Sequence, residues 1–170
     1  QELESAMEIC RNHRAVEIHV AKDDVERNKL WAGRKGAYPS LVRSAPNMII
    51  GDIVVPISKI TEMVNQAYNT ASKHNVKIAC FGHSGDGNVH PNIMTDRTDK
   101  DLWKRAVMVN EEIVSYAIRL GGVASGEHGI GIEKKQFMEL EHGNSLALMK
   151  SIKQLLDPNF IMNPGKFFDP

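Results

Sequence analysis

Two long segments of the chain carry apolar residues at the three- and four-residue spacing that is typical of an amphipathic helix. The first, residues 58–74, presents Ile60, Met63, Val64, Ala67, Tyr68 and Ala71 on one face. The second, residues 98–120, presents Leu102, Ala106, Val109, Ile113, Tyr116 and Leu120. Thr98 and Asp101 have the spacing of a capping box, which favours a helix start there. We also predict helices over residues 1–13, 23–36 and 145–156, with Leu30 and Trp31 buried in the second of these.

Shorter apolar segments predict strands over residues 15–20, 48–56, 76–83 and 88–94. The last two are joined by a tight turn, so they must pair antiparallel. Prolines at 39 and 46 predict a loop over 38–47, and glycines predict a loop after residue 122 that leads into another helix. The chain is therefore expected to be an α+β protein, an antiparallel sheet with packed helices and ferredoxin-like elements.

Composition limits the classes of function. The chain has 170 residues, with 21 Lys and Arg against 21 Asp and Glu, so no net charge draws it to nucleic acid or to an anionic membrane. No apolar run approaches the roughly 20 residues that a membrane span needs. Cys10 and Cys80 lack metal-type spacing and are expected to be buried free thiols. The chain opens at Gln1 inside a predicted helix, and we expect a fragment of a longer protein.

The segment "FGHSGDGNVHPN", residues 81–92, places histidines on both sides of a predicted hairpin turn. Asp-Gly is a preferred two-residue turn. A turn centred on Asp86 and Gly87 would set His83 opposite His90, with Asn92 on the same face of the sheet. The apolar residues Val76, Ile78, Cys80, Val89 and Ile93 would lie on the other face. The two imidazoles could then share one metal ion, although an exposed hairpin that merely carries two histidines is the alternative.

A second glycine-rich segment, "GGVASGEHGIG", supplies Glu127 and His128. The glycines suggest a backbone that approaches something closely. A phosphate loop and a plain solvated turn are alternatives. With His83 and His90, Glu127 would complete a set of two imidazoles and one carboxylate, which suits zinc, iron or manganese. His128 would remain available for proton transfer, and Arg34 is the candidate to clamp an anion.

Four motifs occur in an order that resembles a known family: "LWAGRKGAYPS", "GHSGDGNVHPN", "GGVASGEHGIGIEK" and "LLDPNFIMNPGKF". They resemble the C-terminal domain of FAD-linked oxidases of the vanillyl-alcohol-oxidase type, and within these the glycolate oxidase flavin subunit and D-lactate dehydrogenase group. The resemblance implies oxidation of a D-2-hydroxy acid to a 2-oxo acid, with hydride transfer to FAD.

The resemblance also implies roles for single residues. His83, His90 and Glu127 would bind the divalent metal, and His128 would be the general base. Three further residues would contact the substrate, and one would lie near the flavin. The substrate residues are Arg34, Tyr38 and Asn92, and the flavin residue is Asn163. Relatives that act on diacids have a lysine where this chain has Ile50, so a small monocarboxylate such as D-lactate or glycolate is expected.

The resemblance places all of residues 1–170 in one substrate- and metal-binding domain. FAD would be held mainly by an N-terminal domain outside this sequence, so the chain alone is expected to be inactive. An electron-transfer subunit is an expected partner, and the expected location is the cytoplasm, peripheral to the inner membrane through partner subunits. A non-catalytic binding module is the alternative function. A zinc hydrolase is a weaker alternative, because no glutamate lies beside a histidine pair on one helix.

Overall fold

The structure is a computed structural model that describes residues 1–168. It divides into two compact units, residues 1–41 and the chain from Val42 onward. The mixture of helices with an antiparallel sheet confirms the α+β class.

The first unit consists of helix α1, Glu2–Asn12, and most of helix α2, Asp24–Val42. Helix α2 continues through Pro39, so the predicted loop from residue 38 is wrong over its first half. No strand forms over residues 15–20, where Val16 is fully exposed and the described chain offers no partner strand. Leu30 and Trp31 are 49% and 55% exposed, against the predicted burial. Neither helix has a buried residue, because so short a unit has little interior.

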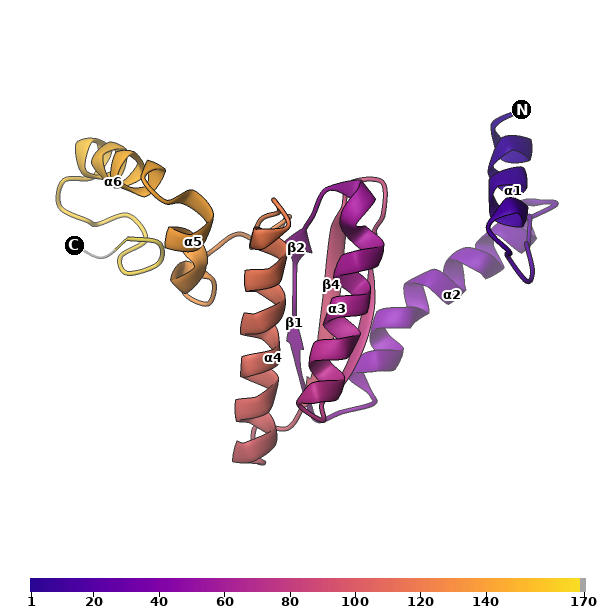
Figure 1. Ribbon diagram of the computed structural model, residues 1–170, viewed down its shortest axis with the longest axis horizontal. Coiled ribbons are helices and arrows are strands. Elements are labelled where there is room, and N and C mark those ends of the chain that lie inside the picture. The colour runs from indigo at the N-terminus through magenta and orange to yellow at the C-terminus, as the bar shows by residue number, and fades with distance from the viewer. Residues whose placement is uncertain (169–170) are drawn as a thin grey trace. The chain divides into compact units, whose positions relative to one another are not determined.

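The second unit is built on a sheet in which every pairing is antiparallel (Figure 1). Its central strand is β4, Asn88–Thr95. Strand β3, Lys77–His83, pairs with one edge of β4. Strands β1, Asn47–Ile50, and β2, Ile53–Val54, pair in succession with the other edge. The predicted strand over residues 48–56 is therefore present in two parts.

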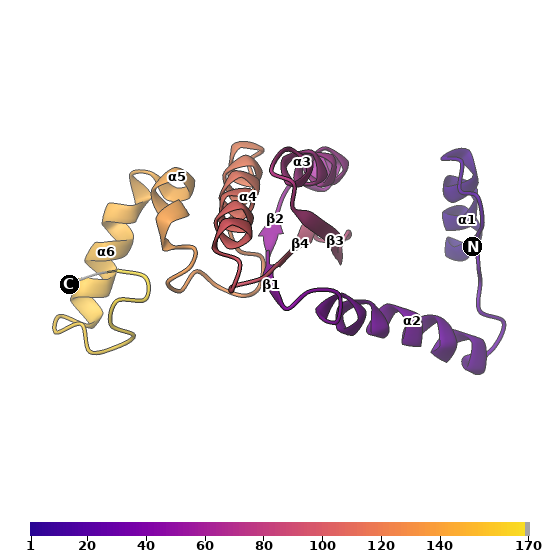
Figure 2. The same cartoon turned by 90° about the horizontal axis from the view of Figure 1, so that it is seen from below.

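Helix α3, Ile60–Lys73, and helix α4, Lys100–Arg119, lie side by side on one face of this sheet (Figure 2). A short 3₁₀ helix, Ile57–Lys59, leads into α3. The core between the helices and the sheet includes the predicted core side of the hairpin and the predicted apolar faces of both helices, except Tyr68, which is 46% exposed. Helix α4 is capped by Asp99, whose carboxylate accepts the backbone N–H groups of Asp101 and Leu102, so the predicted capping box is wrong.

Three short elements follow the glycine-rich loop. They are the 3₁₀ helix Lys135–Phe137, helix α5, Met138–His142, and helix α6, Ser145–Leu156. The described tail after α6 is irregular, as predicted. Asp157 organises its first turn, because its carboxylate binds the ammonium of Lys153 and accepts the backbone N–H groups of Ile161 and Met162.

The two free thiols differ in their surroundings, and a difference in reactivity should follow. Cys10 is exposed, contrary to the predicted burial, whereas Cys80 packs against the core and burial raises its pKa to about 11. At about pH 8 such a thiol is thiolate in only about one molecule in a thousand. Iodoacetamide labelling followed by mass spectrometry should therefore modify Cys10 at least about tenfold faster than Cys80. Denaturant should remove the difference, and equal rates in the folded chain would contradict the burial.

Candidate metal centre

The site begins at a break between β1 and β2. Ile50 pairs with Asn92, and Ile53 pairs with Val89, so the register continues unchanged across the break. It places Gly51 opposite Pro91 and Asp52 opposite His90. Asp52 is completely buried. Burying a carboxylate costs free energy unless it is fully hydrogen-bonded, so the hydrogen-bond partners of Asp52 indicate the role of the break.

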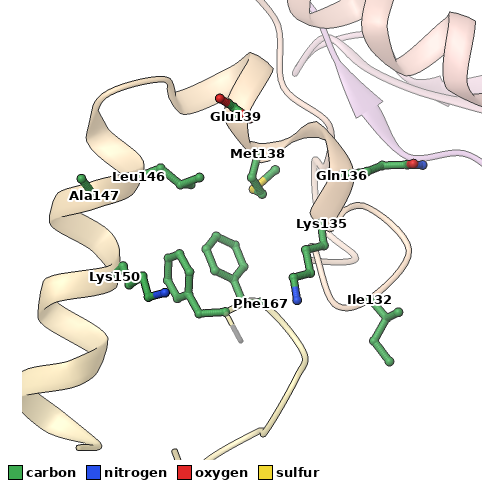
Figure 3. A pocket seen from close by; sticks show the side chains of 10 residues that line it. Ile132, Lys135, Gln136, Met138, Glu139, Leu146, Ala147, Lys150 and Phe167 are labelled. Atoms are coloured by element: carbon green, nitrogen blue, oxygen red, sulfur yellow. The ribbon is translucent and has the colours of Figure 1, made fainter. Parts of the chain in front are cut away.

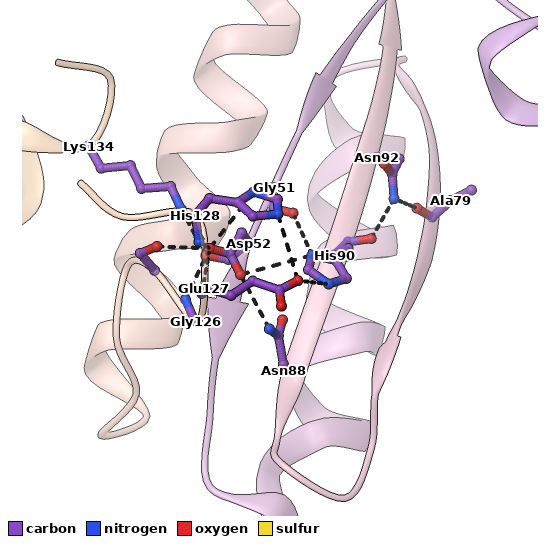
Figure 4. Close-up of polar contacts among 11 residues, drawn as sticks. Gly51, Asp52, Ala79, Asn88, His90, Asn92, Gly126, Glu127, His128 and Lys134 are labelled. Carbon is purple, nitrogen blue, oxygen red and sulfur yellow. Dashed lines mark hydrogen bonds and ion pairs between the residues drawn. The ribbon is translucent and has the colours of Figure 1, made fainter. Parts of the chain in front are cut away.

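The carboxylate of Asp52 anchors the glycine-rich loop. Its Oδ2 accepts successive backbone N–H groups from Gly126 at 3.1 Å, Glu127 at 3.1 Å and His128 at 2.8 Å. The same oxygen accepts the hydroxyl of Ser125 at 2.8 Å and lies 3.2 Å from Lys134 Nζ. Figure 4 shows this carboxylate between Lys134 and the loop. The backbone of Glu127 and His128 is thus held at a fixed place beside β4.

These contacts decide the charge of Asp52. Burial opposes ionisation, but the backbone N–H groups of His128 and Glu127, the Ser125 hydroxyl and the Lys134 ammonium outweigh it and hold the pKa of Asp52 well below its usual range. Gly126 allows the close approach, because a Cβ atom there would lie 2.6 Å from Asn88 Nδ2 and 2.9 Å from Asp52 Oδ1. The prediction that this glycine-rich backbone approaches another group closely is confirmed, and that group is the Asp52 carboxylate.

The hairpin that carries the histidines has a different register from the predicted one. His83 pairs with Asn88, and His90 pairs with Phe81, because residues 84–87 form a four-residue turn. The direct pairing of His83 with His90 is therefore wrong. The register differs by two residues, and an even shift leaves each side chain on its face. His83, His90 and Asn92 consequently still share the face opposite the helices.

Four side chains converge beside β4: Asp52, His90, Glu127 and His128. One ligand atom from each lies within 4.8 Å of all the others. His90 Nε2 is 3.3 Å from Glu127 Oε1, and His128 Nε2 is 3.7 Å from the same oxygen. The rings of His90 and His128 stack with centroids 5.6 Å apart. Glu127 therefore reaches the histidine face.

This arrangement fits a divalent metal ion. Both oxygens of Asp52 already have donors, because Oδ2 accepts those given above and Oδ1 accepts from Asn88 Nδ2 at 3.3 Å. The atoms with further capacity to bind an ion are therefore those of His90, Glu127 and His128 (Figure 4). Two imidazoles and one carboxylate are a donor set for zinc, iron or manganese. His83 lies outside the converging group, although its ring centroid is 5.6 Å from that of His90. Its role as a ligand stays a prediction.

The remaining predicted residues fall in separate places. Asn92 is fully buried on β4, where its Nδ2 donates to the backbone carbonyl of His90 at 2.7 Å, while its Oδ1 has no donor among the described residues. Arg34 and Tyr38 lie on α2, in the first unit. Asn163 lies in the tail with a positive φ of 50°. The substrate and flavin roles of all four stay predictions.

Two of the cavities in the second unit are lined by residues of, or just after, the glycine-rich loop. One, of about 480 Å³, is lined by His128, Ile50 of β1, Trp103 and Val107 of α4, and Arg97. The other, of about 750 Å³, is lined by Lys135, Met138, Leu146 and Phe167 and includes no residue of the converging group (Figure 3). The smaller cavity is the better candidate for a substrate, because a group capable of proton transfer opens into it.

Asp52 and Lys134 are the functional residues that sequence reasoning missed. The signal for Asp52 was a charged residue inside an apolar strand, "MIIGDIVVP", since aspartate is almost never buried without partners. Lys134 gave no comparable signal, because a lysine after a loop is usually solvated.

Comparison with known proteins agrees with the motifs. A family described as the C-terminal domain of FAD-linked oxidases matches residues 1–167. The chain belongs to this family. As an FAD-linked oxidase domain, it is 37% identical over 169 residues to the glycolate oxidase subunit GlcD of Bacillus subtilis, covering 99% of the chain and 36% of that protein.

Two further relatives show the same pattern. A mitochondrial D-lactate dehydrogenase (cytochrome) of Arabidopsis thaliana is 32% identical, over all of this chain and 30% of the relative. The GlcD subunit of Escherichia coli K12 is 30% identical, over 98% of the chain and 34% of the relative. The chain thus spans about a third of the length of these curated relatives. In the part that the structure describes, no helix is both long enough and apolar enough to cross a bilayer.

Proposed function

We propose that the chain is the substrate- and metal-binding domain of a flavin-dependent D-2-hydroxyacid dehydrogenase or oxidase that produces the 2-oxo acid. The convergence of His90, Glu127 and His128 on one centre carries this proposal. The names of the relatives, glycolate oxidase and D-lactate dehydrogenase, support it. FAD would be bound mainly by an N-terminal domain, and an electron-transfer subunit would be a further partner. The proposed location is cytoplasmic, peripheral to the inner membrane through partner subunits, although the Arabidopsis relative is named mitochondrial.

The residues of the site have distinct tasks in this proposal. His90 and Glu127 hold the divalent metal with His83 as the second imidazole, its ring centroid 5.6 Å from that of His90, and His128 lies beside this centre without binding the ion. When bound, the metal supplies a Lewis acid that favours ionisation of the substrate hydroxyl. His128 accepts the hydroxyl proton, because its ring is about half exposed and its backbone is fixed by Asp52. Arg34 and Asn92 bind the substrate, with Arg34 pairing with the carboxylate.

The smaller cavity favours a monocarboxylate. Ile50 lines it together with His128, and an isoleucine offers no charge for a second carboxylate of the substrate. Arg97, the cation in the same wall, has its guanidinium stacked on the Trp103 ring at 4.7 Å. An apolar wall at this place suits the methyl group of D-lactate and tolerates glycolate. We therefore propose these two acids as the first substrates to test.

Changing His90 to alanine tests the proposal. In the flavoprotein that carries this chain, we expect His90→Ala to weaken metal binding by at least about a hundredfold and to abolish D-lactate and glycolate oxidation, since the change removes a ligand outright. Metal content after dialysis and substrate-dependent flavin reduction are the two measurements. The control is His142→Ala, because His142 lies on α5 and pairs only with Glu141 within the described part of the chain.

The outcomes are distinguishable. Undiminished metal content and oxidation in His90→Ala would refute the metal role. A protein that binds metal through His90 but reduces no flavin with any 2-hydroxy acid would instead be the non-catalytic binding module.

A further inference from the structure

Pro91 occupies an unusual place, the middle of the central strand β4. It pairs with Cys80 of β3 on one side and lies opposite Gly51 on the other. Proline has no N–H group, so it is normally confined to edge strands or bulges. Here it is fully buried and lies directly after His90. A residue that removes a hydrogen bond from the centre of a sheet calls for an explanation.

The missing hydrogen bond can be located. The Gly51 N–H donates to the Pro91 carbonyl at 2.9 Å, so these two residues form a hydrogen-bonded pair of the antiparallel ladder. In such a pair residue 91 would return an N–H to the Gly51 carbonyl, and proline cannot. The Gly51 carbonyl instead lies 3.2 Å from His90 Nδ1. The His90 side chain therefore occupies the carbonyl acceptor of Gly51 that Pro91 leaves without a backbone donor.

This contact determines where the proton of His90 lies. A carbonyl oxygen can only accept, so Nδ1 must carry the hydrogen. Asp52 Oδ1, 4.0 Å from Nδ1, favours the same placement. In the neutral ring the lone pair is then on Nε2. This nitrogen lies 3.3 Å from the Glu127 carboxylate, which is the acceptor that opposes this tautomer in the metal-free chain. Ring nitrogens that bind metal are commonly prepared in this way by a second acceptor.

Gly51 is matched to this proline. A Cβ atom at residue 51 would lie 2.8 Å from both Cγ and Cδ of Pro91, so the proline ring occupies the space of any side chain there. The two residues together set the distance between the Gly51 carbonyl and the His90 ring.

We propose that Pro91, with Gly51, is a positioning element that fixes the orientation and the tautomer of His90 for metal binding. The proposal rests on the proposed function, because it assigns His90 as a ligand. It also makes a claim about the metal-free chain, namely that neutral His90 carries its hydrogen on Nδ1. That claim can be tested separately from metal binding.

The test compares the chain with its Pro91→Ala variant. Long-range ¹H–¹⁵N correlation spectra at about pH 8, where imidazoles are ordinarily neutral, report which ring nitrogen is protonated. We expect the Nδ1–H tautomer of His90 in the unsubstituted chain and a mixture in the variant, whose new N–H competes for the Gly51 carbonyl. Zinc titration should show an affinity about ten- to a hundredfold lower in the variant. Pro56→Ala is the control, because Pro56 is an exposed proline that follows strand β2 and lies outside the sheet.

A merely structural proline would give a different result. The variant would then lose thermal stability, because the buried ring is removed, while keeping the tautomer and the zinc affinity of the unsubstituted chain. An Nε2–H tautomer in the unsubstituted chain would overturn the proposal even if Pro91→Ala failed to fold. Unchanged tautomer and zinc affinity in a folded variant would do so too. Absence of zinc binding by the unsubstituted chain, with the Nδ1–H tautomer present, would refute the proposed function instead.

Discussion

Asp52→Ala is expected to lower the free energy of unfolding by about 3–5 kcal/mol, the usual result of removing one partner from a buried ion pair. The substitution leaves Lys134, whose side chain is only 14% exposed, without its carboxylate. It also leaves the N–H groups of Gly126, Glu127 and His128 without an acceptor. Because these amides hold the loop in place, metal affinity should fall with stability. Urea denaturation and zinc titration measure the two effects.

The control for Asp52 is Asp101→Ala. Asp101 is 80% exposed and pairs with Arg105, so its removal should cost at most about 1 kcal/mol. Acid should reproduce part of the Asp52 effect. Because the pKa of Asp52 is lowered in the folded chain, its contribution is fully present above the unfolded value of about 3.9 and is lost as the pH falls below it. The stability difference between the chain and Asp52→Ala should therefore be constant from about pH 6 to 8 and shrink in acid. A difference that is already small at neutral pH would contradict the anchoring role.

The fold of the second unit was predictable because its patterns are long and depend on burial. The apolar stripes of residues 58–74 and 98–120 both face the sheet, and helices α3 and α4 follow within two residues at each end. Residues 15–20 show the limit of the same reasoning. Their apolar alternation predicts a strand, but a strand needs a partner, and the pattern contains no information about one.

The site was predictable in its residues more than in its geometry. An Asp-Gly pair is compatible with more than one turn length, so the predicted register of the hairpin was wrong by two residues. Because side chains alternate between the two faces of a strand, a shift of two residues kept His90 on the predicted face. The meeting of Glu127 with His90 depends on Asp52, which is 75 residues away from Glu127 in sequence. Local patterns cannot reveal contacts of that range, and the role of Asp52 emerges only from the folded chain.

The hairpin turn leads to the other prediction with a large effect, Gly87→Ala. Gly87 has a φ of 77°, a conformation that disfavours any residue with a Cβ atom. A Cβ atom there would also collide with the backbone carbonyl of Val55. This carbonyl cannot move aside without disturbing β2, because the Val55 N–H donates to the Gly87 carbonyl. Strain and overpacking together should cost about 2–4 kcal/mol in the free energy of unfolding.

Gly85, two residues earlier in the same turn, is the matched control. It has no positive φ, and a Cβ atom there meets nothing within 4 Å. Gly85→Ala should therefore change stability by less than about 1 kcal/mol, and it can even stabilise the chain by restricting the unfolded state. Gly87 directly precedes β4, and its carbonyl accepts the N–H of Val55, which directly follows β2. Its substitution should therefore also move His90 relative to Asp52 and weaken zinc binding. Equal unfolding midpoints for the two variants in urea would show that the turn tolerates a side chain at either glycine, and that the hairpin register does not depend on Gly87.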